Sequence, residues 1–478
     1  MVESGTADLV INGGIIVSPD AECRASIAVK DGAILAIGMQ EVMPPATEIL
    51  DASGLHILPG AIDVHVHFRD PGYPHKEDFE SGSAGAAFGG VTTVFDMPNT
   101  VPTVSSPETL AGKHRIAASK SYVDYGLYPV LGEDSITHVP ALIEGGVIGF
   151  KLYMGNTFGR IPCPTTGAML EAFEIVAPTG KRIALHAETN SIMERREARL
   201  RTAGINTPIA HLASRPAVVA IEAVSRAAVL AEWTGARIHI LHISSAAELR
   251  PLAEAKARGV DVTGETCPHY LLLSESDYEK VGGIVRVNPP VREGFNRAPL
   301  WQGLLNGTID MIATDHAPHA REEKTRSDIW TVDCGFPGVE TQMPLMLTEV
   351  SRGRGTLRDY VRWSAEKPAK AWGLYPRKGA IAPGSDADLA IVDLNRRWKI
   401  DDEQIQSRAK ASPWDGREVT ALPIHTLVRG KFVMKDRKLQ NEARGWGRSV
   451  HRFQQMPLPA PRNQDQTLAA ITERKSHS

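Results

Sequence analysis

The first sixty residues alternate between hydrophobic and polar positions. The segments 8–18, 25–38 and 47–60 follow this two-residue period, and Asn-Gly and Asp-Gly pairs supply turn signals. Such alternation places successive side chains on opposite faces of a β-strand, and these dipeptides favour tight turns. We therefore expect the chain to begin with short β-strands.

From Gly60 the pattern changes to apolar segments of strand length that alternate with longer amphipathic stretches rich in Ala and Glu. The stretches 216–235 and 246–259 are predicted helices, and each ends near a glycine that can cap it. Eight segments are predicted as strands, namely 61–68, 91–99, 123–131, 147–155, 182–188, 237–244, 261–270 and 310–319. Eight parallel βα units close a TIM barrel, so we predict an α/β fold built on a (β/α)₈ barrel.

Strand-like segments return after Gly379, at 386–394, 397–400 and 425–439. The simplest packing joins them to the N-terminal strands in one small β-sandwich domain formed from both chain ends. The predicted organisation is a sandwich from residues 1–58 and 379–444, a barrel from 59–378, and a tail from 445–478. The tail is rich in Pro, Gln and Arg, a composition typical of an extended or disordered segment.

Composition narrows the range of partners. The 478 residues are 42% hydrophobic and 23% charged, with a formal net charge of -3, as in an ordinary globular protein. Nucleic acid and membrane are not expected as partners, because both favour a basic surface. The four cysteines have no paired spacing, and we find neither a signal peptide nor an apolar segment of about 18 residues. We expect a cytoplasmic enzyme that acts on a small molecule.

Ionisable residues gather at the carboxyl ends of the predicted barrel strands, where TIM barrels build active sites. In strand order they are His65, His67, Lys151, His186, His242 and Asp315. The first two stand two residues apart on one strand, so both side chains face the barrel mouth. Imidazole ligands favour zinc, and the set predicts two divalent metal ions, expected to be Zn²⁺. Carboxylation of the lysine by CO₂ would supply the bridging oxygen ligands.

Each of these residues also has a structural interpretation. A buried histidine at a strand end is more often a hydrogen-bonded core residue than a ligand. Lys151 could pair with Glu188, and Asp315 could cap a helix. These interpretations apply to the residues one at a time, whereas the whole set on one rim favours a metal site.

The same segments resemble a known family over almost the whole chain. LPGAIDVHVHFRDPG, FKLYMG, LHAE, ETCPHYL, NPPVRE and ATDHAPH are similar to segments of the cyclic amidohydrolases of the amidohydrolase superfamily: dihydroorotases, allantoinases and hydantoinases. The resemblance implies the ligand set His65, His67, carboxylated Lys151, His186, His242 and Asp315. It also implies a barrel with a flanking β-sandwich, and a homo-oligomer, either a dimer or a tetramer.

Three further residues bear on the substrate. In dihydroorotases the residues that match Arg69, Asn99 and His319 hold the ring carboxylate of the substrate. This role suits arginine, because a guanidinium binds a carboxylate through two parallel hydrogen bonds. The structural alternative for Arg69 is a salt bridge with Asp70 or Asp78.

Other segments resemble different members of the family. KLYMGNTFG resembles dihydroorotases in which a Thr-Phe pair, here Thr157 and Phe158, lies on a mobile loop that closes over the substrate. Backbone groups near Asn288 are implied to bind the ring amide. The segments NPPVRE, LWQGLLNGTIDM, KGAIAPGSDADLAIVD and KASPWDGREVTALPIHTLVRGK look more like those of allantoinases and hydantoinases.

We therefore predict reversible hydrolysis of dihydroorotate to N-carbamoyl-aspartate, a reaction of pyrimidine metabolism. Asp315 would accept a proton from a metal-activated water and deliver it to the leaving nitrogen. The alternative is an allantoinase, or a hydantoinase or dihydropyrimidinase that opens a cyclic ureide in catabolism. A non-catalytic structural partner is disfavoured, because such superfamily members lose metal ligands and this chain keeps all six.

Overall fold

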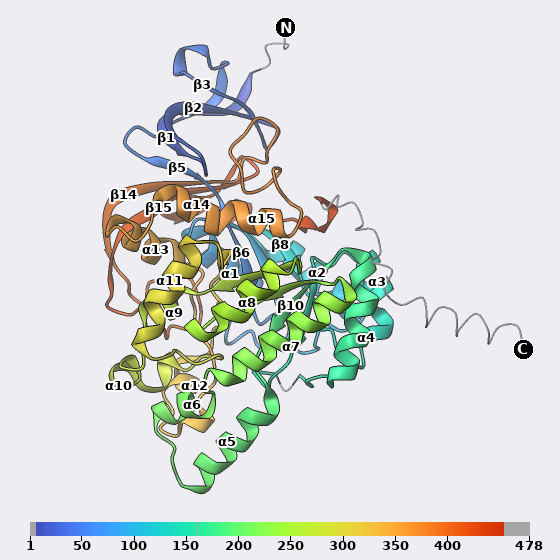
Figure 1. The fold of residues 1–478 in the computed structure, drawn as a ribbon. Helices are drawn as coiled ribbons and strands as arrows, with labels where there is room; N and C mark the ends of the chain where they lie inside the picture. Colours follow the sequence, from blue (N-terminus) through green and yellow to red (C-terminus); the bar gives the residue numbers. More distant parts are fainter. Residues whose placement is uncertain (1–5, 160, 454–478) are drawn as a thin grey trace, which may run out of the picture.

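The computed structural model describes residues 6–159 and 161–453. Its centre is a barrel wrapped by helices, and a β-sheet built from both ends of the chain lies at one end of that barrel (Figure 1). The N-terminal strands are blue in Figure 1, and the C-terminal strands that lie beside them are orange to red.

Eight parallel strands form the barrel. They pair in chain order within two groups, β6–β7–β8 and β9 to β13. Two single bridges close the ring, Val130 with Lys151 between the groups and Val66 with His316 between the last strand and the first. The strands are β6 (Ala61–Val66), β7 (Val91–Asp96), β8 (Asp124–Leu127), β9 (Phe150–Tyr153), β10 (Arg182–His186), β11 (Arg237–Ile240), β12 (Val262–Thr266) and β13 (Met311–Ile312). The predicted (β/α)₈ barrel is confirmed.

The barrel strands are buried on both faces. Every residue of β6 to β10 is buried, because helices cover the outside and side chains fill the inside. The seventh predicted strand is too long: its last residues form helix α9 (Pro268–Leu272). Proline suits the first turn of a helix, where its missing N–H has no partner to lose.

Helices cover the outside of the barrel (Figure 1). The two helices predicted above are α7 (Val218–Thr234) and α8 (Leu249–Ala257). Gly235 ends α7 with φ +72°, a left-handed conformation that glycine adopts without steric cost. The others are α1 (Phe79–Phe88), α2 (Pro107–Lys120), α3 (Val139–Glu144), α4 (Thr166–Val176), α5 (Asn190–Thr202), α6 (Pro208–Ser214), α10 (Asp277–Val281), α11 (Arg297–Leu305), α12 (Arg321–Lys324), α13 (Gln342–Ser351), α14 (Leu357–Val361) and α15 (Lys367–Ala371). None of the helices described is long and apolar enough to cross a membrane.

The strands of the two chain ends form one continuous sheet. Its order is β17-β16-β15-β14-β5-β1-β2-β3, and β4 pairs with β1. The N-terminal strands are β1 (Ala7–Val17), β2 (Glu22–Lys30), β3 (Ala33–Gly38), β4 (Ala46–Asp51) and β5 (His56–Pro59). The C-terminal strands are β14 (Leu389–Lys399), β15 (Glu418–Val428), β16 (Lys431–Lys435) and β17 (Lys438–Leu439). The antiparallel pairing of β5 with β14 joins the two chain ends, as predicted.

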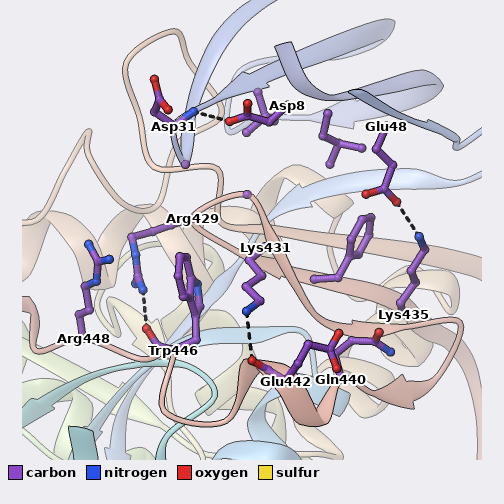
Figure 2. Close-up of a pocket in the computed structure, with 15 residues that line it drawn as sticks. Asp8, Asp31, Glu48, Arg429, Lys431, Lys435, Gln440, Glu442, Trp446 and Arg448 are labelled. Atoms are coloured by element: carbon purple, nitrogen blue, oxygen red, sulfur yellow. Dashed lines mark hydrogen bonds and ion pairs between the residues drawn. The ribbon is translucent and has the colours of Figure 1, made fainter. Parts of the chain in front are cut away.

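Figure 2 shows a pocket where the N-terminal strands face the β15–β16 hairpin. Lys435 of β16 pairs with Glu48 of β4 at 2.6 Å. The guanidinium of Arg429, between β15 and β16, donates to the carbonyl oxygen of Trp446 at 2.6 Å. The first contact joins two strands of the sheet, and the second connects the sheet to the chain segment that follows it.

The first residues of the predicted tail pack against the barrel. The Trp446 indole donates to the Val428 carbonyl at 2.8 Å, and the Tyr125 amide of β8 donates to the Arg448 carbonyl at 2.9 Å. Trp446 and Arg448 therefore contact the sheet and the barrel, and residues 454–478 of the predicted tail lie outside the described residues.

A buried ion network connects the sheet to the barrel at the opposite end from the candidate site. Lys378 lies 2.7 Å from Asp124, the first residue of β8, and 2.5 Å from Asp388 next to β14. Arg429 also pairs with Asp124. Removing one partner from such a network leaves an uncompensated buried charge, at a typical cost of about 3–5 kcal/mol. The network therefore holds the sheet and the barrel together.

Candidate active site

The six predicted metal ligands lie together at the carboxyl ends of the barrel strands. Two of them belong to β6 and the turn after it, two to β9 and β10, and two to the turns after β11 and β13. All line one cavity and all are buried: His65, His67, Lys151, His186, His242 and Asp315.

One group consists of His65, His67 and Asp315. The two Nε2 atoms lie 3.2 and 3.1 Å from the same Asp315 Oδ1. The opposite nitrogens have other partners, since His65 Nδ1 donates to Glu265 at 2.7 Å and His67 Nδ1 donates to Asn99 Oδ1 at 2.6 Å. With the protons held on Nδ1, both Nε2 atoms present lone pairs toward one point, as metal ligands must.

A second group lies across the cavity. His186 Nδ1 and His242 Nε2 are 2.9 Å apart. His186 commits its other nitrogen to Glu188, as a donor at 3.1 Å, so its Nδ1 also carries a lone pair. Five potential metal-ligating atoms, four nitrogens and one oxygen, thus lie in two groups. These residues fit a pair of divalent cations.

Burial keeps the imidazoles of this site in the neutral form that metals require. It holds the pKa of His65, His67 and His242 well below the usual imidazole range, with the neighbouring cations adding to the effect. Burial likewise lowers the pKa of Lys151 and raises that of Asp315. Neutral imidazole is the form that binds a metal.

Two other carboxylate-rich groups have the spacing of a metal site. One consists of His319, Glu323 and Asp333, and the other of Asp124, Asp386 and Asp388. A lysine ammonium already occupies each, since Lys76 pairs with Glu323 and Asp333 and Lys378 pairs with all three aspartates. Within residues 6–159 and 161–453, the group around Asp315 alone among the three has no such ion pair.

Backbone strain marks the same region. Arg69, His242 and Asp315 have φ of +60°, +40° and +48°, a left-handed conformation that L-residues other than glycine rarely adopt. Such strain costs about 1–3 kcal/mol for each residue and persists mainly where function requires a particular geometry.

The predicted substrate residues divide into two sets. Arg69, Asn99, Asn288, Thr157 and Phe158 line the cavity with the six ligands. His319 does not line the cavity, but its Nε2 lies 3.1 Å from Arg69 Nη2. The sequence predicts His319 near the position of the substrate carboxylate. Whether its side chain reaches the cavity depends on packing between distant segments, which the sequence does not show.

The alternative ion pairs considered above for Arg69 and Lys151 are not observed. Asp70 pairs with Lys120 at 2.7 Å rather than with Arg69, and Asp78 pairs with Arg408 at 2.9 Å. Glu188 pairs with Arg215 rather than with Lys151.

Two residues in the site were missed by the sequence analysis. Glu265 of β12 accepts hydrogen bonds from His65 and, at 3.0 Å, from His239 Nε2. Tyr153, two residues after Lys151 on β9, lines the cavity, and its buried hydroxyl has no hydrogen-bond partner in the described residues. Glu265 could have been found as an acidic residue inside a buried strand. Tyr153 could have been found because a residue two positions after Lys151 on a strand faces the same side.

Comparisons with known proteins identify the family of this chain. Residues 56–433 match the model of the amidohydrolase family. The chain is 35% identical over 450 residues to an L-hydantoinase of Paenarthrobacter aurescens, covering 93% of this chain and 98% of the relative. It is 36% identical over 417 residues to a dihydroorotase of Methanothermobacter thermautotrophicus, covering 87% and 92%.

An allantoinase of Deinococcus radiodurans is 35% identical over 441 residues, covering 92% of this chain and 98% of the relative. The solved structure of the L-hydantoinase (dihydropyrimidinase) from Arthrobacter aurescens superposes with a TM-score of 0.90 at 35% identity, covering 92% of this chain and 99% of that chain. The chain belongs to the amidohydrolase family. Within that family it is a hydrolase of the cyclic amidohydrolase group.

The Glu265 contacts generate a first prediction. Glu265→Gln should lower metal affinity by about 10- to 100-fold, because the neutral amide holds the His65 proton more weakly and makes the ring a poorer ligand. Competition with a chelator measures this affinity. Glu248→Gln is the matched control, since Glu248 is equally buried but accepts hydrogen bonds from Ser244 and Ser245. Equal metal affinity in the two variants would contradict the assigned role.

Proposed function

We propose that this chain hydrolyses a cyclic ureide whose ring carries a carboxylate, and that the substrate is dihydroorotate, opened reversibly to N-carbamoyl-aspartate. The observation that carries the proposal is the Arg69 guanidinium. The residue is 1% exposed, and its Nη1 has no hydrogen-bond partner in the described part of the chain. Arg69 also lines the cavity that holds the candidate metal ligands.

A buried cation with an unmet donor is costly. Burial lowers the pKa of Arg69 to about 10, so the residue is still charged at neutral pH. Desolvation of an ion costs several kcal/mol unless a counter-charge meets it. A substrate carboxylate would supply that counter-charge and form two parallel hydrogen bonds with the guanidinium. Neutral rings such as hydantoin or allantoin would leave it unmet.

The metal ions would be held by the two groups described above together with Lys151, which lines the same cavity. We propose that Lys151 is carboxylated, its neutral amine adding to CO₂ with loss of one proton. The Lys151 side chain lies in the same cavity as all four histidines, and it forms no salt bridge with any residue that the structure describes. Bound divalent ions would lower the pKa of a water molecule and polarise the substrate carbonyl.

The protein side chains complete the reaction. Asp315, whose pKa burial raises, is suited to accept a proton from the attacking water and deliver it to the ring nitrogen that leaves. The unpartnered Tyr153 hydroxyl can donate to the carbonyl oxygen as negative charge develops there. The Asn288 side-chain oxygen, also buried without a partner among the described residues, can accept from a ring N–H.

Thr157 and Phe158 line the cavity, and we propose that they form a lid over it. The Phe158 ring lies 4.6 Å from the Arg69 guanidinium carbon, and its carbonyl accepts from Asn99 Nδ2 at 3.3 Å. The free space in this cavity measures about 20 Å³, room for roughly one water molecule. A ring substrate therefore enters only when this segment moves, which supports the proposal of a lid.

A second candidate is hydrolysis of hydantoin or allantoin. The observation that favours it is the set of relatives, because the L-hydantoinase and the allantoinase match as well as the dihydroorotase does. A homo-oligomer, dimer or tetramer, and a cytoplasmic location stay predictions.

Arg69→Met tests the choice of substrate. With dihydroorotate, kcat/KM should fall by roughly 30- to 5,000-fold, equivalent to about 2–5 kcal/mol of lost transition-state binding. With 5,6-dihydrouracil, the same ring without its carboxylate, kcat/KM should stay within about threefold. If the wild-type enzyme cleaves hydantoin or allantoin much faster than dihydroorotate and Arg69→Met is neutral, the second candidate replaces the first.

Lys151→Ala tests the carbamate. The wild-type protein should hold close to two divalent ions per chain, and the variant should lose nearly all turnover, because the bridging oxygens are gone. Short carboxylic acids added to the assay should restore part of it. Metal analysis and turnover with and without acetate measure both effects. Near-normal metal content and turnover in the variant would exclude a carbamate.

Thr157→Ala tests the lid. We expect kcat to fall more than tenfold with unchanged metal content, because closure excludes water and completes the site. Thr166→Ala is the control, since Thr166 is exposed at the start of α4 and does not line the cavity. Equal kcat in the two variants would make Thr157 an ordinary loop residue.

A further inference from the structure

A buried lysine contacts His319, the imidazole that lies next to Arg69. Lys76 is 3% exposed, and its Nζ has three acceptors. These are Glu323 Oε2 at 2.8 Å, Asp333 Oδ2 at 3.0 Å and His319 Nδ1 at 2.8 Å. An ammonium has three N–H groups and no lone pair. All three donors are therefore used, and His319 Nδ1 can only be an acceptor.

This assignment determines the other nitrogen of the ring. Burial holds the pKa of His319 well below the usual imidazole range, with the Arg69 charge adding to the effect, so the ring is neutral. A neutral imidazole carries one proton, which must then be on Nε2. Nε2 lies 3.0 Å from the carbonyl oxygen of Cys334 and donates to it.

The consequence falls on Arg69. Its Nη2 lies 3.1 Å from His319 Nε2, but two N–H donors cannot satisfy each other. Arg69 Nη1 has no partner within the described residues, and only Nε finds an acceptor, the Pro318 carbonyl at 3.3 Å. Both outer nitrogens of the guanidinium thus lack an acceptor.

We propose that Lys76 is a positioning residue for substrate recognition. By holding the His319 proton on Nε2, it prevents the imidazole from accepting a hydrogen bond from Arg69. The subsite then presents the two outer nitrogens of Arg69 as donors without an acceptor, and these select a planar carboxylate on the substrate ring. This inference rests on the proposed function, because it assumes that Arg69 meets the ring carboxylate.

The competing interpretation is a purely structural ion cluster. Lys76 joins the segment after β6 to the segment that carries Glu323 and Asp333, and loss of those ion pairs alone would disturb the whole site. In that case its removal would affect metal binding, stability and every ligand together. Under the proposal, removal affects carboxylate binding selectively. The His319 proton would move to Nδ1, which lies 3.5 Å from Asp333, and Nε2 would then accept from Arg69.

Binding of orotate to the metal-loaded, full-length protein tests the proposal without requiring turnover. Calorimetry at about pH 8.5, roughly two units above the ordinary imidazole pKa, keeps His319 neutral in the variants as well. Lys76→Met removes the donor, and we expect the Kd of orotate to rise at least about tenfold while metal content and melting temperature stay close to wild type. Lys76→Arg keeps a charged donor and should stay within about threefold.

Lys120→Met is the matched control. Lys120 also pairs with two carboxylates, Asp70 and Asp78, but makes no contact with His319. Its loss should leave orotate affinity unchanged. Equal orotate affinity in wild type and Lys76→Met would overturn the proposal, as would a loss in Lys76→Arg as large as in Lys76→Met. A parallel loss of metal in Lys76→Met would favour the structural interpretation and would also overturn the proposal.

The tautomer can be read directly if Lys76→Met does not fold. Nitrogen-15 spectra of histidine-labelled wild-type protein, assigned with His319→Gln, should show the proton on Nε2; a proton on Nδ1 would overturn the proposal. Failure of the proposed function gives a different result. A protein that binds orotate as expected but does not hydrolyse dihydroorotate would contradict the function and leave the Lys76 inference standing, whereas absence of orotate binding would overturn the inference itself.

Discussion

The chemistry of this site depends on how each imidazole divides its two nitrogens. A neutral ring carries one proton, and a partner that claims one nitrogen decides whether the other donates or accepts. Glu265 and Asn99 accept hydrogen bonds from the Nδ1 atoms of His65 and His67. The Nε2 atoms of both rings then carry lone pairs that face Asp315. At His319 the partner is the Lys76 ammonium, which donates to Nδ1. The proton of this ring is therefore on Nε2.

Burial makes these assignments firm. In water a histidine would exchange between tautomers and take up a proton near neutral pH, but the barrel interior disfavours the charged form. The barrel thus places neutral lone pairs on one side of the cavity and unmet cationic donors on the other. The Arg69 guanidinium carries those donors, and it lines the same cavity as the ligands. A substrate ring with a carbonyl at one end and a carboxylate at the other fits the two regions, the carbonyl at the metal ligands and the carboxylate at Arg69.

Local patterns predict the parts of this structure that depend on local geometry. Alternation in β6 gave His65 and His67 a common direction, and the strand-end positions of His186, His242 and Asp315 brought the ligands together. Contacts between distant segments were not predictable in this way. Glu265 meets a histidine 200 residues earlier, and Lys76 meets His319 only because the loops after the first and last barrel strands pack together. Whether the His319 side chain reaches the cavity depends on the same packing.

The sheet shared by both chain ends sets an order for biosynthesis. Ile57 of β5 pairs with Ile391 of β14, so at about 5–20 residues per second a ribosome needs roughly 20 to 70 seconds to deliver the partner strand. During that interval β5 has an unpaired edge, which is a template for pairing with other nascent chains. The yield of native protein therefore depends on how this edge is shielded while the barrel is still being translated.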